Sequence, residues 1–233
     1  MADGITIHYR FDFPTGEGKE FALELESATL LLMAVPSPGS PFWAKLENHQ
    51  CPSCRFSPKN SEFCPIARNM VQIVEEFKDY FSYDNVKVTV TTEERSYCKE
   101  TTLQAGLSSL IGIIMVSSGC PAMEKLKPMV RFHLPFATLD ETIFRTISMY
   151  LVSVYYRQRR GEFVDWSLAG MVDLYTSVAV VNVAFAERLR EAAKKDANVN
   201  ALVNLYCFAE IVPFAAEEML DKLENHFSAL LAN

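Results

Sequence analysis

ITIHYRFDFPTGEGKEFALELE, residues 5–26, decides how the fold begins, because its apolar and polar side chains alternate along the chain. A repeat of two residues is that of a β-strand with one buried face. The first set of apolar side chains on one face is Ile5, Ile7, Tyr9, Phe11 and Phe13. PTGEGK supplies a turn, and Phe21, Leu23 and Leu25 resume the alternation. The stretch therefore predicts a β-hairpin.

The next regular segments predict a helix over residues 65–81 and a third strand around residues 86–90. From about Thr102 the apolar spacing is helical to the end of the chain. TLDE, residues 138–141, has the form of a capping box and predicts the start of a long helix. Asp165 and Asp196 are predicted N-caps of two further helices, the second of which Pro213 should kink or divide.

These patterns predict an α+β fold with a small N-terminal antiparallel sheet and one packed helix, followed by a C-terminal helical bundle. The sheet, a cysteine-containing loop and the packed helix fall in residues 1–101, and the bundle falls in residues 102–233. With 233 residues and 49% hydrophobic content, the chain can bury a substantial core. We expect the two parts to form one integrated domain.

Charge and hydropathy exclude several classes of partner. The net charge of −7 and the pI near 5.2 argue against nucleic acid and against an anionic membrane. The N-terminal residues lack the pattern of a secretory signal, and the apolar run at residues 107–116 is shorter than a bilayer span. We therefore expect a soluble cytoplasmic protein, in a compartment that keeps thiols reduced.

Four cysteines lie in loop contexts that suit metal ligation. Cys51 and Cys54 have the C-x2-C spacing that lets two sulfurs of one turn face a single ion. Cys64 precedes Pro65, and Cys120 lies between Gly119 and Pro121. Proline at the first helical position puts each preceding sulfur at a helix N-terminus, where the dipole favours a thiolate. We predict a four-cysteine site that joins the two parts of the chain.

The ligand types do not separate two candidate cofactors. Structural zinc binds four cysteines with this knuckle spacing. A [4Fe–4S] cluster also takes four cysteine thiolates, and Cys-Pro pairs occur in bacterial ferredoxins. Zinc and the cluster are therefore left as near-equal alternatives. Cys98 and Cys207 are expected to be unligated, and His49 is a possible replacement ligand.

Two other readings of the same residues stay open, so enzymatic activity is undecided. CPSC, residues 51–54, has the form of a thiol–disulfide redox motif, with Cys51 as nucleophile and Cys54 as the resolving thiol. Its flanking segments lack the strand and helix that such a motif requires. Alternatively, the protein is a metal-free structural or interaction protein, in which case a homodimer would form through an apolar helix face. No small-molecule ligand is identified by the sequence.

The stretch KPMVRFHLPFATLDE, residues 127–141, contains further polar residues in apolar surroundings. Arg131 and His133 could line a pocket, and Glu141 or Asp140 could orient His133 as a base. A histidine hydrogen-bonded near a loop is the simpler interpretation. Asn182 lies on a strongly apolar helix and needs a polar partner if it faces inward.

Several motifs together carry a family resemblance: HQCPSC, CPIARNM, TTLQAGLSSLIG, SSGCP, LKPMVRFHLPFA and ETIFRTISMYL. In these motifs the chain resembles a family of uncharacterised bacterial proteins defined by a domain of unknown function. The resemblance covers nearly the whole chain and implies one shared architecture in a bacterial cytoplasm. It implies no activity, cofactor or partner, so the predicted metal site rests on spacing and loop chemistry alone.

Overall fold

The alternating N-terminal stretch forms the predicted hairpin. The computed structural model describes residues 4–33, 39 and 41–232. Strand β1 (Gly4–Asp12) pairs antiparallel with β2 (Gly18–Glu26), and Gly16 adopts a φ of +87° in the turn between them. The buried side chains on the inner face include Ile7, Tyr9, Phe11, Phe21, Leu23 and Leu25. Their alternation with exposed residues confirms the predicted register of buried and exposed faces.

The sheet has four antiparallel strands in the order β2-β1-β3-β4. The third predicted strand is β3 (Asn85–Thr91), which pairs with β1. Strand β4 (Ser96–Thr102) was not predicted; it pairs with β3 at the edge of the sheet. None of its side chains is buried, so it has no apolar alternation by which it could be recognised. Backbone pairing alone defines this strand.

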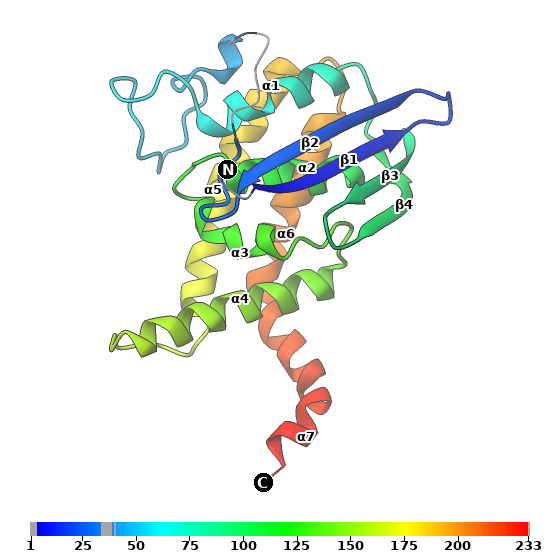
Figure 1. The fold of residues 1–233 in the computed structure, drawn as a ribbon. Coiled ribbons are helices and arrows are strands. Elements are labelled where there is room, and N and C mark those ends of the chain that lie inside the picture. Colours follow the sequence, from blue (N-terminus) through cyan, green and yellow to red (C-terminus); the bar gives the residue numbers. More distant parts are fainter. Residues whose placement is uncertain (1–3, 34–38, 40, 233) are drawn as a thin grey trace.

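Two helices cover the inner face of the sheet (Figure 1). Helix α1 (Pro65–Phe77) ends four residues earlier than predicted, because residues 78–84 form turns in which the Asp84 carboxylate accepts a hydrogen bond from Phe81 N–H. Helix α2 (Leu103–Ser117) is apolar around most of its circumference. Such a helix needs neighbours on every side, and the sheet and the C-terminal helices provide them.

The remainder of the chain is helical, which confirms the α+β class. One buried apolar cluster runs from the sheet through α2 into the C-terminal helices. In Figure 1, α5 and α6 run side by side behind α2, and α4 crosses below them. The helices not yet given are η1 (Phe42–Ala44), η2 (Glu124–Leu126), α3 (Lys127–Arg131), α4 (Leu139–Arg159), α5 (Ala169–Ala192), α6 (Ala197–Leu223), η3 (Glu224–Phe227) and α7 (Ser228–Leu231).

The predicted caps have different outcomes. At α4, the Thr138 hydroxyl accepts from Glu141 N–H and the Glu141 carboxylate accepts from Thr138 N–H, so the capping box is confirmed. The Asp165 cap is wrong, because its carboxylate bonds to Ser167 and α5 begins only at Ala169. Asp196 stands at the N-cap of α6, but its carboxylate accepts from Ser82.

Pro213 lies within α6 and does not divide it. The predicted alternatives were a kink or a division; because α6 is α-helical from Ala197 to Leu223, the division is wrong, and the kink stays a prediction. The pyrrolidine ring removes one backbone donor, and the long apolar contact of α6 with α2, α4 and α5 holds the helix together.

Many large apolar side chains of the C-terminal helices are exposed. Phe214 and Leu230 are 85% and 82% exposed. Two helical stretches, Ala169–Ala192 and Ala197–Leu231, have the length and composition of membrane spans. The buried helices of water-soluble proteins also pass this test, so it is weak evidence. The structure describes a single chain, and the homodimer stays a prediction.

Two glycines of α2 give a matched test of this packing. A Cβ at Gly106 would lie 2.7 Å from Val88 Cγ2 and 3.1 Å from Phe11 Cε1, both on the sheet. A Cβ at Gly112 would meet only Leu205, at 3.6 Å. We expect Gly106→Ala to lower the free energy of unfolding by about 1–3 kcal/mol through overpacking. Gly112→Ala should raise it by up to about 1 kcal/mol, since alanine has the higher helix propensity.

Urea denaturation followed by circular dichroism would measure both effects on the free energy of unfolding. Equal effects of the two substitutions would contradict the close approach of α2 to the sheet.

Candidate functional site

The cysteine-containing segment is a loop whose two ends are joined by backbone hydrogen bonds. Lys45 and Phe63 form an isolated antiparallel bridge, and Leu46 N–H donates to Glu62 C=O. Cys64 N–H donates to Ala44 C=O at 3.0 Å. The intervening residues contain turns but no helix or strand. The closed base of the loop fixes where Cys64 enters α1.

The structure confirms the local geometry predicted for the first three cysteines. Cys54 N–H donates to Cys51 C=O at 3.0 Å, so CPSC forms a tight turn. Cys64 is the N-cap of α1, with Pro65 at the first helical position and no hydrogen bond from its side chain to the helix. The Cys64 sulfur is therefore not used as a cap.

Cys120 follows the end of α2. Gly119 adopts a φ of +85°, which is the turn predicted there. Pro121 does not open a helix directly, which corrects the prediction, because residues 121–123 form a turn before η2. Within this turn, the backbone N–H groups of Met123 and Glu124 donate to Cys120 C=O, each at 3.0 Å. These bonds fix the backbone of the turn that carries the Cys120 side chain.

The four predicted ligands share one neighbourhood. Burial, followed by the charges of Cys64, Cys120 and Cys54, raises the pKa of the Cys51 thiol to about 12. Burial also raises the pKa of Cys120, which interacts with Cys64 and Cys54. All four residues are half-buried, and three of them pack against the core. The thiols are thus close enough for their charges to affect one another's pKa values.

The other two cysteines lie apart from this group, which we call the thiol cluster. Cys98 is on the edge strand β4 and Cys207 is on α6, and both are exposed. Within residues 4–33, 39 and 41–232, no three His, Cys, Asp or Glu side chains are arranged closely enough to hold a metal ion. Ligation would require the sulfurs of the thiol cluster to move closer together.

A buried arginine, Arg188, forms hydrogen bonds with the backbone at the start of the loop. Arg188 of α5 is 2% exposed and donates to three carbonyls: Trp43 C=O at 3.0 Å, Lys45 C=O at 2.5 Å and Leu46 C=O at 2.8 Å. Its charge also acts to lower the pKa of Cys51, against the larger raising effect of burial. The arginine therefore fixes the start of the loop and carries a positive charge to its base.

Glu191, one turn further along α5, holds the next residues of the loop. Its carboxylate accepts hydrogen bonds from Asn48 at 2.7 Å and pairs with His49 Nε2 at 2.9 Å. His49 is thereby engaged with Glu191, and it is not brought into the thiol cluster. Its φ of +42° shows that the chain turns sharply just before Cys51.

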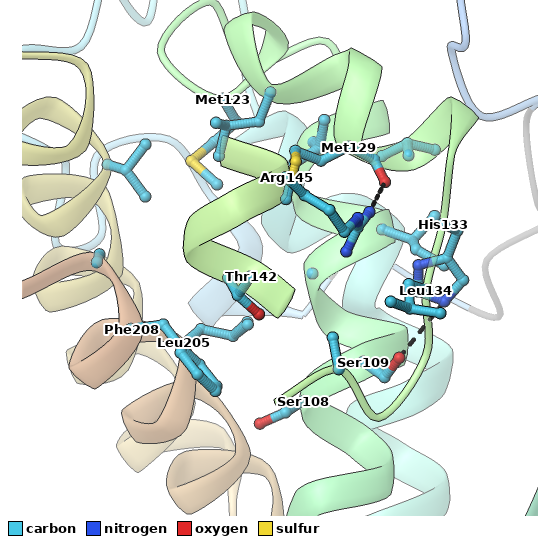
Figure 2. Close-up of a pocket in the computed structure, with 18 of the residues that line it drawn as sticks. Ser108, Ser109, Met123, Met129, His133, Leu134, Thr142, Arg145, Leu205 and Phe208 are labelled. Atoms are coloured by element: carbon cyan, nitrogen blue, oxygen red, sulfur yellow. Dashed lines mark hydrogen bonds between the residues drawn. The ribbon is translucent and has the colours of Figure 1, made fainter. Parts of the chain in front are cut away.

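A second group of polar side chains lies in a pocket (Figure 2). The Tyr9 hydroxyl lies 2.7 Å from His133 Nε2 and 2.9 Å from the Ser109 hydroxyl. Burial, followed by the charge of Arg145, lowers the pKa of His133 to about 3. The imidazole is therefore neutral at physiological pH, and it accepts a hydrogen bond from Tyr9 in the tautomer with Nε2 unprotonated.

The pocket tests the roles predicted for the polar residues in the segment 127–141. His133 lines the cavity, as considered, but Arg131 is exposed and is not among the lining residues. Glu141 does not orient His133, because its carboxylate is used in the capping box. The hydrogen-bond partner of His133 is Tyr9 instead. The two residues are 124 positions apart in the sequence, so no local pattern could predict their contact. The charged group in the cavity wall is Arg145.

The fold and these two sites define an α+β protein with a thiol cluster on one side of α2 and a largely apolar pocket on another. A family model described as a domain of unknown function, DUF6901, matches residues 7–228. The chain therefore belongs to this family, which confirms the resemblance to a domain of unknown function. No curated protein and no solved structure is significantly similar to the chain.

Replacing Arg188 tests whether it holds the cysteine-containing loop. Arg188→Met removes the donor of three buried carbonyls, and we expect the free energy of unfolding to fall by about 3–5 kcal/mol. Arg190→Met on the same helix removes only an exposed pair with Glu187 and should change it by less than about 1 kcal/mol. Chemical denaturation would measure both. A small effect of Arg188→Met would show that the loop does not depend on this side chain.

Acid should destabilise the protein through His133. Its pKa is about 3 in the folded state and about 6.5 in the unfolded chain, so the unfolded state binds more protons between these values. Stability is therefore lost as pH falls from about 6.5 towards 3. Between pH 7 and pH 5 we expect the wild type to lose about 1–2 kcal/mol more than His133→Gln. Urea denaturation at the two pH values would measure the loss.

The control for this test is His8→Gln, which changes an exposed histidine on the same strand as Tyr9. It should leave the wild-type difference between pH 7 and pH 5 intact. A His133→Gln variant with the full wild-type loss would contradict the neutral, buried imidazole.

Proposed function

We propose that the protein binds a metal centre, either one zinc ion or one [4Fe–4S] cluster, through Cys51, Cys54, Cys64 and Cys120. The observation that carries this proposal is the tight turn that joins Cys51 to Cys54, together with half-buried Cys64 at the N-cap of α1 and half-buried Cys120 after α2. Zinc and the cluster both take four cysteine thiolates. The physiological role that such a centre would serve lies beyond this proposal.

Metal binding at these cysteines requires the thiols to lose their protons. Thiols with raised pKa values are protonated at neutral pH, and their sulfurs are poor ligands until a metal displaces the protons. Four bound thiolates would then carry more negative charge than a zinc ion or an oxidised cluster neutralises. The charge of the Arg188 guanidinium would offset part of this excess.

The location of the ligands supports a structural role. Cys51, Cys54 and Cys64 belong to the loop before α1, whereas Cys120 follows α2. A bound centre would link this irregular loop to the end of the most buried helix. The binding free energy of a structural metal contributes directly to folding. Free thiols persist in a reducing compartment, so we also propose a cytoplasmic location.

The redox alternative has less support. A nucleophilic cysteine needs a lowered pKa and a helix start, but the pKa of Cys51 is raised and residues 52–57 form a turn and an irregular segment. The metal-free alternative has its support in the spacing of the thiols, which would have to approach one another for ligation. Metal analysis separates these readings.

The first experiment is metal analysis of protein purified without oxygen and without chelators. A [4Fe–4S] centre predicts about four irons per chain and a broad visible absorption band, and a structural zinc predicts about one zinc and no colour. Serine substitutions of Cys51, Cys54, Cys64 or Cys120 should each remove most of the metal. Cys98→Ser and Cys207→Ser are matched controls that should retain it, because both cysteines lie outside the thiol cluster.

Reconstitution makes the result decisive for protein isolated without metal. Adding zinc to the metal-free chain at neutral pH should release on the order of four protons per ion bound, since the thiols must be deprotonated. Failure to bind either zinc or a reconstituted cluster in stoichiometric amounts would overturn the proposal. Equal metal loss from the Cys98 and Cys207 controls would overturn the choice of ligands.

A further inference from the structure

The pocket beside His133 is a cavity of about 220 Å³ between α2, the segment 123–137, α4, α5 and α6. Its wall is mostly apolar, and Figure 2 shows Met123, Leu134, Leu205 and Phe208 around it. An apolar cavity of about 150 Å³ holds one benzene molecule. By the same proportion, this cavity has room for a ligand of about nine non-hydrogen atoms.

Arg145 supplies positive charge to this apolar wall. Its Nη2 donates to Phe132 C=O at 2.7 Å and to Met129 C=O at 3.0 Å, which holds the guanidinium in place (Figure 2). Across the described part of the chain, no carboxylate forms an ion pair with Arg145. Glu141 is near enough to interact with its charge, but its carboxylate is bonded in the capping box. The remaining guanidinium donors are therefore available to an anion.

Asn182 supplies an uncharged polar group. Its side chain is 2% exposed and lines the cavity, and its Oδ1 has no hydrogen-bond partner among the described residues. A buried amide without a partner is destabilising by about 1–3 kcal/mol. A polar group that enters the cavity can supply the missing hydrogen bond.

The two polar groups line the cavity from different helices. Arg145 belongs to α4 and Asn182 belongs to α5. A ligand that reaches both therefore needs two separate hydrogen-bonding groups joined by an apolar body.

We infer that this cavity binds a small monocarboxylate with an apolar body about the size of one aromatic ring and a hydroxyl group at the far end. The carboxylate pairs with Arg145, the ring fills the apolar cavity, and the hydroxyl donates to Asn182. The neutral His133 is already bonded to Tyr9 and contributes only to the shape of the wall. This site is separate from the thiol cluster and does not depend on a metal.

Three probes of nearly equal size separate the contributions. Isothermal titration calorimetry would compare 4-hydroxybenzoate, benzoate and 4-hydroxybenzamide, which differ in the hydroxyl and in the charge. We expect 4-hydroxybenzoate to bind tightest. Benzoate should bind several-fold more weakly, because Asn182 then lacks its partner, and neutral 4-hydroxybenzamide should bind at least tenfold more weakly.

Matched variants connect each effect to a residue. Arg145→Gln should reduce the preference for 4-hydroxybenzoate over 4-hydroxybenzamide to near one, and Arg159→Gln on the exposed end of α4 should retain it. Asn182→Leu should abolish the preference for 4-hydroxybenzoate over benzoate. Gly112→Leu adds a side chain where a Cβ meets only Leu205 at 3.6 Å, so the chain should fold while the filled cavity loses at least tenfold in affinity.

The inference is overturned if none of the three probes binds saturably to the wild-type protein. It is also overturned if the carboxylate and the carboxamide bind equally, or if Gly112→Leu folds and binds 4-hydroxybenzoate as the wild type does. Because Arg145 also holds two backbone carbonyls, circular dichroism must show that Arg145→Gln is folded. If it is not, the Gly112→Leu and Asn182→Leu results decide the question.

Discussion

The close packing of α2 against the sheet is the constraint on which both sites depend. Gly106 lets the helix approach Val88 and Phe11 so closely that even a methyl group would clash. This contact fixes the direction of α2 through the core. The helix then presents Ser109 and Gly112 to the pocket and ends just before Gly119 and Cys120. A shift of α2 would therefore displace a wall of the pocket and one member of the thiol cluster together.

Arg188 presents an unusual electrostatic arrangement. A buried cation is costly unless hydrogen bonds and negative charge compensate it. Three carbonyls satisfy its donors, but they are dipoles with no net charge. The charge of Arg188 helps to lower the pKa of Glu191, but the Glu191 carboxylate is exposed and is bonded to Asn48 and His49. Thiolates at the neighbouring cluster would complete the compensation, which is the physical reason to connect Arg188 with ligation.

The sequence was informative wherever the signal was local. The hairpin, the Cys64–Pro65 helix start, the Gly119 turn and the Thr138 capping box each follow from a few adjacent residues. Strand β4 could not be recognised because it buries no side chain. The N-cap prediction for Asp165 was wrong because its carboxylate accepts a hydrogen bond from Ser167. The pairing of Tyr9 with His133 and of Arg188 with Trp43 depends on tertiary packing, which local patterns do not encode.

Residues 120–126 contribute to both proposed sites, which would couple binding at one site to binding at the other. Cys120 and Met123 are joined by a backbone hydrogen bond, while Met123 and Leu126 line the pocket. A metal bound at Cys120 would restrict this turn, and the turn forms part of the wall against which the apolar body of a ligand packs. Ordering the wall before a ligand arrives reduces the entropy lost on binding. If both proposals hold, the thiol cluster and the pocket are thermodynamically coupled through residues 120–126, and the coupling must act equally in both directions.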